Sequence, residues 1–244
     1  IQNAAVDIIH SQFNTEKLKL VIDKILGYYE ENGFPFATIK IEKFEIDTIS
    51  ASVKINLNLL RGDSVKIESF RISGNEVTDE DIMIRRIDIG RGGLYKKSLI
   101  DKIPSQLMKL DIFESVSKPE IYFNKTGGVL GISVKEARTL SFDGILGYVP
   151  SENSDEKGEI TGLVNISFNN LFGTARKLNL VWQRENRSSQ TISLRYVEPN
   201  IASLPVRMEL SFLQREQDSL YVQRNLKINN SLVLRDNFIG SIYF

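Results

Sequence analysis

Hydrophobic and polar side chains alternate through much of the second half of the chain. Between Glu159 and Asn200, every second residue falls into one of two sets, one apolar and one mostly polar. The apolar set is Val164, Ile166, Phe168, Leu178, Leu180, Trp182, Ile192, Leu194 and Tyr196. The polar set includes Asn165, Ser167, Asn169, Asn179, Gln183, Thr191, Ser193 and Arg195. A period of two residues is typical of β-strands, so this stretch predicts three strands with alternating faces.

The alternation continues on both sides of this stretch. Further strands are predicted near residues 140–149, 206–215 and 221–235, and the final run FIGSIYF resumes the pattern. The strands are long, about 9 to 15 residues, where about 5 or 6 is usual for soluble proteins. A soluble sandwich has short strands, whereas a transmembrane barrel needs about 9 to 11 residues per crossing, apolar toward lipid and polar toward the lumen. Strand length and the charged polar face favour six or seven antiparallel strands of such a barrel.

The first 62 residues predict a partial α+β module. Residues 1–13 place apolar side chains on one helical face, and Asn14 or Thr15 caps a second helix that ends at Asn32-Gly33. Two strands follow, near residues 37–47 and 49–60. Relative to the module that comes next, a first strand is missing.

A second, complete module is predicted from Val65 onward. After a first strand, Thr78 and Asp81 are expected to form a capping box for a helix that reaches about Ile87. A second helix over about 99–110 and strands near 115–123 and 129–137 complete the order β-α-α-β-β. Because the first module shows the same order without its first strand, we predict an internal repeat of roughly 70 residues.

Composition narrows the class of protein. The 244 residues include 31 Lys and Arg and 31 Asp and Glu, so a net charge of zero gives no reason to expect a nucleic-acid partner. The chain has no Cys, which excludes disulfides and thiolate metal sites within it. No apolar run approaches the roughly 18 residues of a membrane-spanning helix, so any insertion must use strands. Because the chain opens at Ile1 and stops in mid-strand, we expect a fragment truncated at both ends.

Three runs of residues carry a family resemblance. The sequences RGDSVKIESFRISGNEVTDEDI, IGRGGLYKKSLIDKI and LMKLDIFESVSKPEI resemble a POTRA domain of the BamA and TamA family of outer-membrane assembly factors. In that family POTRA domains precede a barrel whose early strands are similar to FNNLFGTARKL and RYVEPN. The resemblance implies a partial POTRA domain at 1–62, a complete one at 63–138 and the start of the barrel at 139–244. One departure is Pro104, which is expected to kink or break the second helix.

Catalytic chemistry is not predicted. His10 is the only His, so neither a Ser-His-Asp triad nor a His-rich metal site can be built within the chain. Neither a nucleophile elbow nor a phosphate-binding P-loop motif occurs. We therefore predict no enzyme activity, no cofactor and no metal.

Two strand edges are the candidate binding sites. The strand pair between Ser115 and Ala137 leaves an edge that can accept an extended client by backbone pairing, unless neighbours protect it. The strand after Arg138 is the second candidate, because its glycines weaken register, although they equally permit curvature. In the family that the chain resembles, the first barrel strand forms the seam that admits client strands. The resemblance assigns this role to Phe142, Gly144, Leu146, Gly147 and Tyr148.

The resemblance also implies the setting of this function. We expect an outer-membrane protein assembly and insertion factor, with its barrel in the bacterial outer membrane and its POTRA domains in the periplasm. Its partners would be unfolded outer-membrane or secreted protein clients, periplasmic or lipoprotein accessory subunits, and outer-membrane lipid.

Three alternatives stay open. A two-partner secretion transporter of similar build would export one dedicated substrate. A patatin-like lipase would use this region as a membrane anchor, although such proteins usually carry one POTRA domain. A soluble sandwich would bury the apolar strand faces and purify without detergent.

Overall fold

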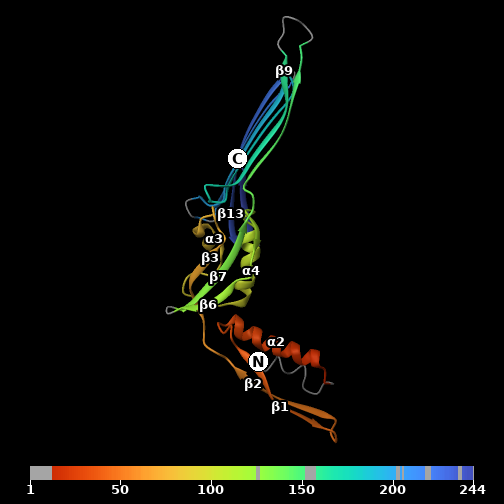
Figure 1. Ribbon diagram of the computed structural model, residues 1–244, viewed down its shortest axis with the longest axis vertical. Coiled ribbons are helices and arrows are strands. Elements are labelled where there is room, and N and C mark those ends of the chain that lie inside the picture. The colour runs from red at the N-terminus through yellow and green to blue at the C-terminus, as the bar shows by residue number, and fades with distance from the viewer. Residues whose placement is uncertain are drawn as a thin grey trace. The chain divides into compact units, whose positions relative to one another are not determined.

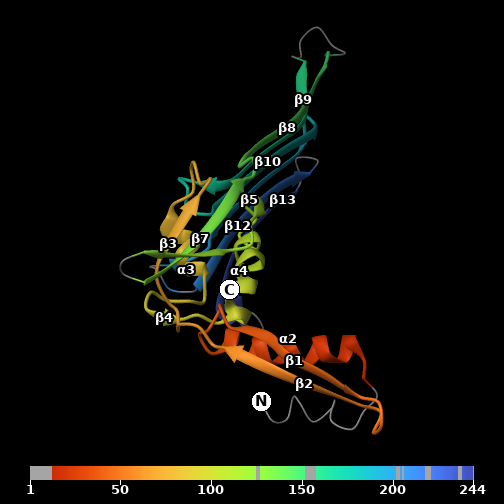
Figure 2. The same cartoon turned by 60° about the horizontal axis from the view of Figure 1, so that its bottom comes forward.

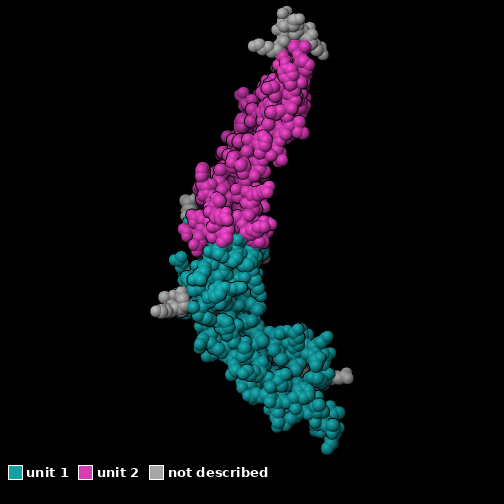
Figure 3. Space-filling view, viewed as in Figure 1, with its two compact units in different colours: residues 1–73, 84–107, 116–134 teal, residues 74–83, 108–115, 135–244 magenta. Residues whose placement is uncertain are grey.

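The computed structural model describes residues 13–124, 127–151, 158–201, 204, 206–217, 221–235 and 238–243. The chain divides into two compact units, which Figure 3 colours separately. Unit 1 comprises residues 1–73, 84–107 and 116–134, and unit 2 comprises residues 74–83, 108–115 and 135–244. The helix expected before Phe13, with His10, lies outside the described residues. Over the ranges given above, none of the helices is long and apolar enough to cross a membrane.

The first module contains helix α2 (Thr15–Glu31) and strands β1 (Thr38–Asp47) and β2 (Ser52–Leu60), drawn in red and orange in Figure 1. Asn14 caps α2, because its side-chain oxygen accepts a hydrogen bond from the Glu16 N–H at 2.7 Å. Paired residues of β1 and β2 place eight apolar side chains on one face of this two-stranded sheet. They are Ile39, Ile41, Phe44, Ile46, Val53, Ile55, Leu57 and Leu59.

The second module adds a mixed sheet and two helices. Its elements are β3 (Lys66–Ser73), α3 (Glu80–Arg86), β4 (Gly93–Leu94), α4 (Lys97–Met108), β5 (Phe113–Val116), β6 (Glu120–Asn124) and β7 (Gly127–Glu136). The strand order is β4-β3-β7-β5, with β6 also paired to β7, and β3 runs parallel to β7. Ile67, Ile103, Leu107, Leu130 and Ile132 are fully buried and form the centre of its core. The predicted order strand, helix, helix, strand, strand is present, but the structure adds the short strand β4 between the two helices and divides the next predicted strand into β5 and β6.

Three local predictions in this module are corrected. The break that Pro104 could cause in α4 does not occur, because burial of Ile100, Ile103 and Leu107 on both sides of the proline holds the helix in place. The predicted single strand over 115–123 is split into β5 and β6. Pro119 lies in the gap between them and has no N–H to donate to a ladder.

The capping residue of α3 also differs from the prediction. Asp79, rather than Thr78, caps the helix, since its carboxylate accepts a hydrogen bond from the Asp81 N–H at 3.0 Å. The Thr78 hydroxyl instead accepts a hydrogen bond from Asn170, 92 residues further along the chain.

Unit 2 is dominated by one seven-stranded antiparallel sheet. Its strands are β8 (Leu140–Val149), β9 (Glu159–Leu171), β10 (Arg176–Asn186), β11 (Ser189–Glu198), β12 (Val206–Gln217), β13 (Tyr221–Arg235) and β14 (Phe238–Tyr243). They pair in chain order from β8 to β14, and they are the long green-to-blue ribbons in Figures 1 and 2. All seven strands predicted from the alternating pattern are therefore present, each within a few residues of its expected range.

The strand register aligns apolar side chains into continuous rows across this sheet. One row runs through Phe142, Ile166, Leu180, Leu194, Phe212 and Leu226. The adjacent row, two residues along, runs through Leu140, Phe168, Leu178, Tyr196, Leu210 and Ile228. The opposite face carries a polar row of Ser141, Ser167, Asn179, Arg195, Ser211 and Lys227. The two faces predicted from sequence are thus those of a single continuous sheet.

The apolar band crosses the strands obliquely. On β8 the positions on the apolar face run from Leu140 to Tyr148 and centre on Gly144. The row of paired residues that contains Gly144 reaches β12 at Gln214. On β12 the outward apolar positions run from Val206 to Phe212 and centre near position 209. From β8 to β12 the centre of the band therefore shifts along the strands by about five residues, or roughly 17 Å. The four strand spacings between β8 and β12 add up to about 19 Å, so the band is inclined by about 40° to the direction perpendicular to the strands. Strands of transmembrane barrels tilt by about 35–45°, and the slant of this band lies within that range.

Candidate functional site: an open sheet edge and its anchor

Strand β8 forms one end of the seven-stranded sheet. Among the described residues it pairs only with β9, through an unbroken register from Leu140 opposite Phe168 to Val149 opposite Glu159. All ten of its residues are exposed, and Ile145 retains 78% of its accessible surface. The predicted site residues Phe142, Gly144, Leu146, Gly147 and Tyr148 all lie on this strand. The structure therefore brings them together along an open edge.

The backbone groups that face this open edge follow from one hydrogen bond. The carbonyl oxygen of Thr139 accepts from the Asn169 N–H at 2.7 Å, so residues 139 and 169 are a hydrogen-bonded pair. In an antiparallel ladder, residues direct their N–H and C=O alternately toward one neighbour and the other. Odd-numbered residues of β8 therefore bond to β9, while Phe142, Gly144, Leu146 and Tyr148 direct their N–H and C=O to the open side. Gly147 differs from the other four because it faces β9.

The glycine that this strand pair requires is on β9. Gly162 lies opposite Leu146 with φ of 147°, and a Cβ atom there would collide with the carbonyl oxygen of Ile145. By contrast, a Cβ on Gly144 would lie 3.3 Å from the nearest atom, the Leu163 carbonyl oxygen. Sequence reasoning missed Gly162, although a glycine within an alternating strand is itself a signal of close backbone approach.

Within unit 2, the turn between β9 and β10 anchors this sheet to the Val77–Asp79 segment. The Asp79 N–H donates to the Gly173 carbonyl at 2.9 Å. The Asn170 amide donates to the Thr78 hydroxyl at 2.9 Å, and its oxygen accepts from the Ala175 N–H at 2.8 Å. Asn170 is only 5% exposed, so both of its polar groups are satisfied where water has little access.

The anchor depends on close backbone approach and on one carboxylate. Gly173 has φ of 70°, and a Cβ atom there would collide with the Val77 carbonyl oxygen, so only glycine fits. The Glu136 carboxylate accepts from the Val77 N–H at 3.0 Å and the Thr78 N–H at 2.7 Å. Burial alone would raise the pKa of Glu136, but hydrogen bonds from Thr78 and its neighbours outweigh burial and hold the pKa below its usual value.

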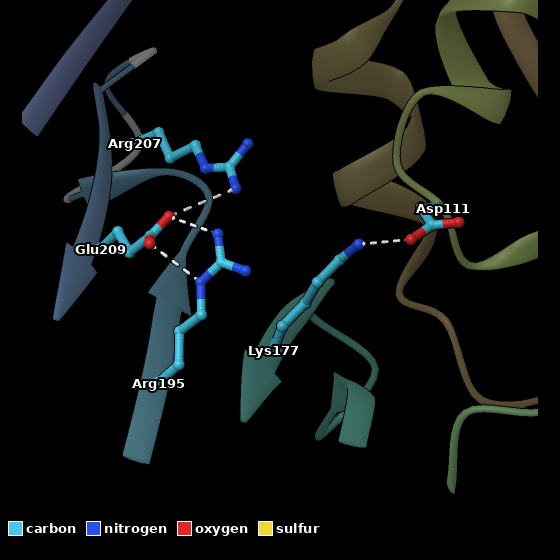
Figure 4. Close-up of polar contacts among 5 residues, drawn as sticks. All are labelled: Asp111, Lys177, Arg195, Arg207 and Glu209. Atoms are coloured by element: carbon cyan, nitrogen blue, oxygen red, sulfur yellow. Dashed lines mark hydrogen bonds and ion pairs between the residues drawn. The ribbon is translucent and has the colours of Figure 1, made fainter. Parts of the chain in front are cut away.

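Charged side chains gather on the polar face at the same end of the sheet, as Figure 4 shows. Arg195 binds Glu209 through two hydrogen bonds of 2.8 Å, and Arg207 lies 3.8 Å from the same carboxylate. Lys177 on β10 pairs with Asp111 at 2.8 Å. The sequence predicted a polar face but not these pairs, since Arg195 stands opposite Ser211 and meets Glu209 on the diagonal.

The second predicted edge is partly confirmed. Strand β7 is central in its sheet, whereas β6 pairs only with β7 within the described part of the chain. Tyr122 and Phe123 on β6 are exposed, and Phe123 contacts Phe36 with ring centroids 5.3 Å apart. Between Ser115 and Ala137, the described edge strands are therefore β6 and the short β5, and β6 is the longer of the two.

The described residues contain no group of three or more His, Asp or Glu side chains that could hold a metal ion. The charged and polar side chains of unit 2 described above instead pair with one another. The arrangement is suited to binding through backbone edges.

Known proteins resemble this chain in sequence. Residues 65–137 match the POTRA family model, described as surface antigen variable number repeat. Over 172 residues the chain is 22% identical to the outer membrane protein assembly factor BamA of Buchnera aphidicola, covering 69% of this chain and 26% of that protein.

Solved structures share the fold. BamA from Haemophilus ducreyi lacking POTRA domains 1–3 superimposes with a TM-score of 0.70 at 18% identity, covering all of this chain and 47% of that chain. CdiB from Acinetobacter baumannii gives a TM-score of 0.50 at 13% identity, covering 99% of this chain and 47% of that one. The chain spans about a quarter of the length of the curated relative and less than half of each solved chain.

The POTRA match and the seven-stranded sheet together define the class of protein: a POTRA domain followed by antiparallel strands that resemble part of an outer-membrane β-barrel. Within that class, the chain is similar in sequence and in fold to the outer membrane protein assembly factor BamA. The fold class and the resemblance stated from sequence are both confirmed.

Proposed function

We propose that this protein assembles and inserts outer-membrane proteins, with the open edge of β8 admitting client strands into the membrane. The observation that carries the proposal is the row of backbone groups on Phe142, Gly144, Leu146 and Tyr148 that face away from β9 and pair with no other described strand, on a strand exposed along its whole length. Such an edge pairs with an incoming strand through main-chain hydrogen bonds, which require no particular client sequence.

The rest of the proposal concerns the other parts of the chain. Residues 1–62 and 63–138 act as periplasmic POTRA domains that bind unfolded clients and accessory subunits, and residues 139–244 contribute strands to a barrel in the outer membrane. The β6 edge is their client-binding strand. The apolar rows face outer-membrane lipid, and the protein performs no enzymatic chemistry.

The side chains of β8 suit a transient partner. At the outward positions, Gly144 stands at the centre of the apolar band and adds no side chain beside an incoming strand. Gly162 lets the β8 and β9 backbones approach closely, which fixes the ladder on the side away from the client. Strand β8 is thus closely paired with β9 on one side, and its other side is available for pairing with a client strand.

A proline scan of β8 in the full-length protein tests this proposal. Proline has no N–H and is tolerated where that group faces away from the ladder. Gly144→Pro removes a donor on the open side, so we expect a folded barrel that fails to assemble clients. Gly147→Pro is the matched control, because it breaks the ladder to β9 and is expected to prevent the barrel itself from folding.

Barrel folding is measured by heat-modifiable mobility, and client assembly by the amounts of several unrelated outer-membrane proteins. Normal assembly of all clients in a folded Gly144→Pro variant would refute the proposal. Loss of a single secreted substrate, with other outer-membrane proteins unaffected, would instead favour the two-partner secretion transporter.

A further inference from the structure

We propose that Glu31 is a positioning residue: the last residue of α2 in the first module caps helix α4 of the second and couples the two modules into one arm. Both helices lie within unit 1. The inference rests on the proposed function for its purpose, because a coupled arm would present the β6 edge to clients in a fixed orientation.

Helix α4 lacks a cap of its own. The Ile100 N–H donates to the Lys96 carbonyl, which makes Lys96 the residue at the N-cap position. The lysine ammonium group has no acceptor for the free N–H groups of the first turn, and that turn contains no acidic residue. Left alone, the N-terminus of α4 would be among the less stable helix ends of the module.

Glu31 supplies the missing acceptor from the other module. One carboxylate oxygen accepts from the Ser98 N–H at 3.0 Å, and the other accepts from the Ser98 hydroxyl. Ser98 is the second residue of α4, so the carboxylate lies where capping side chains bind and where the helix dipole favours a negative charge. The geometry is that of an N-cap contributed by a residue 67 positions earlier in the chain.

Neighbouring contacts hold the same two segments together. Glu30 pairs with Lys97 at 3.0 Å, and the Gly33 carbonyl accepts from the Val65 N–H at 2.8 Å. Gly33 has φ of 96°, and a side chain there would press against Leu94. Three residues at and just after the end of α2 therefore contact the second module, and Glu31 is the one that contacts the N-terminus of α4.

Electrostatics support the assignment. The Ser98 hydroxyl, then the Ser98 N–H, lower the pKa of Glu31 against the opposing effect of burial. Lys96 and Lys102 lower it further. The folded arm thus binds the ionised carboxylate, which is the form that caps a helix most strongly.

The test measures the distance between the modules in the full-length protein. This chain has no Cys, so spin labels are attached through Lys54→Cys on β2 and Lys118→Cys between β5 and β6, with any cysteine elsewhere replaced. We expect a narrow distance distribution by double electron–electron resonance and a clear broadening in Glu31→Ala. Glu30→Gln is the matched control, since it weakens a single, partly exposed ion pair of small expected energy and leaves the cap of α4 in place, so the width should stay nearly unchanged.

A rescue variant separates coupling from capping. Lys96→Ser gives α4 a cap of its own, so Glu31→Ala with Lys96→Ser should regain the stability of α4 while the distance distribution stays broad. A distribution that is unchanged in Glu31→Ala, or that narrows again on adding Lys96→Ser, would overturn the proposal. Should Glu31→Ala fail to fold, Glu31→Gln, which keeps an oxygen acceptor, must still broaden the distribution.

The outcome is independent of the β8 test. If Gly144→Pro left client assembly normal, the distances expected between the modules would not change. If Glu31→Ala left the distance distribution unchanged, the proposal for the β8 edge would still stand.

Discussion

Strands β7 and β8 follow one another in the chain and contain ten residues each, with four apolar side chains on β7 and six on β8, yet they have opposite environments. β7 lies between β3 on one side and β5 and β6 on the other, and Val129, Leu130, Ile132 and Val134 are buried. β8 ends its sheet and is exposed along its whole length. Hydrophobic strands therefore serve two purposes here: one forms a core and the other stays available.

The difference lies in what removes the apolar surface from water. The side chains of β7 are covered by elements of the chain itself, which stabilises the module by about 25 cal/mol for each Å² buried. No element of the described chain covers Phe142, Leu146 or Tyr148, so their burial requires lipid or another strand. Substitutions on the two strands should therefore be detected by different measurements.

The largest contrast is expected from shortening one apolar side chain on each strand. Leu130→Ala leaves a cavity in the core of the POTRA domain and should lower its free energy of unfolding by about 2–5 kcal/mol. Phe142→Ala, at a position 66% exposed, should change the same quantity by less than about 0.5 kcal/mol. Pulse proteolysis of the full-length protein in urea, following cleavage within residues 65–137, measures both. Equal losses would show that β8 contributes to the stability of that domain.

A glycine pair gives the next contrast. A Cβ atom on Gly128 of β7 would lie 2.7 Å from the Lys66 carbonyl oxygen, so Gly128→Ala must displace backbone and should cost about 1–3 kcal/mol. Gly144→Ala on β8 brings its Cβ only to 3.3 Å from a carbonyl oxygen, and we expect a loss below about 1 kcal/mol. The first loss is measured by the same proteolysis, and the second by the temperature at which the barrel loses its heat-modifiable mobility. A greater cost at Gly144 would mean that the β8 ladder is packed as tightly as the POTRA core.

The comparison also shows what the sequence can and cannot predict. Alternation is a local property, so it predicted β7, β8 and the six strands after them to within a few residues. It could not show that β7 is central and β8 terminal, because sheet order depends on pairing between distant segments. The contact of Asn170 with Thr78 spans 92 residues, and that of Lys177 with Asp111 spans 66. No spacing rule connects such pairs, and a local capping pattern cannot reveal that the Thr78 hydroxyl binds Asn170 while Asp79 caps α3.

The predicted edge residues illustrate the same limit. Sequence and resemblance placed all five on one strand, and the structure does so too. Their division into four that face outward from the sheet edge and one, Gly147, that faces β9 required the hydrogen bond between Thr139 and Asn169. Proline tolerance at Pro104 likewise depends on the burial of neighbouring helix residues, which the helix sequence alone does not reveal.

The smallest expected effect concerns pH and the last residue of β7. The pKa of Glu136 is lowered in the folded protein by hydrogen bonds from the Val77–Thr78 segment, so the ionised carboxylate stabilises the fold at neutral pH. A carboxylate with a lowered folded pKa contributes its full stability above its unfolded pKa and loses it as pH falls through the folded value. Because the group is partly exposed, solvent screening should keep the loss below about 1 kcal/mol.

The measurement is the free energy of unfolding of the full-length protein between pH 6 and about pH 3, below the usual carboxyl pKa. Glu136→Gln keeps one oxygen acceptor for the Thr78 N–H but cannot ionise, so it should lower stability at pH 6 and show a shallower decline toward pH 3. Since other carboxylates also titrate in this range, the quantity to compare is the difference in free energy of unfolding between the unsubstituted protein and Glu136→Gln at each pH. A difference that stays constant across the range would mean that Glu136 holds the Val77–Asp79 segment by its shape and hydrogen bonds alone, without a contribution from its charge.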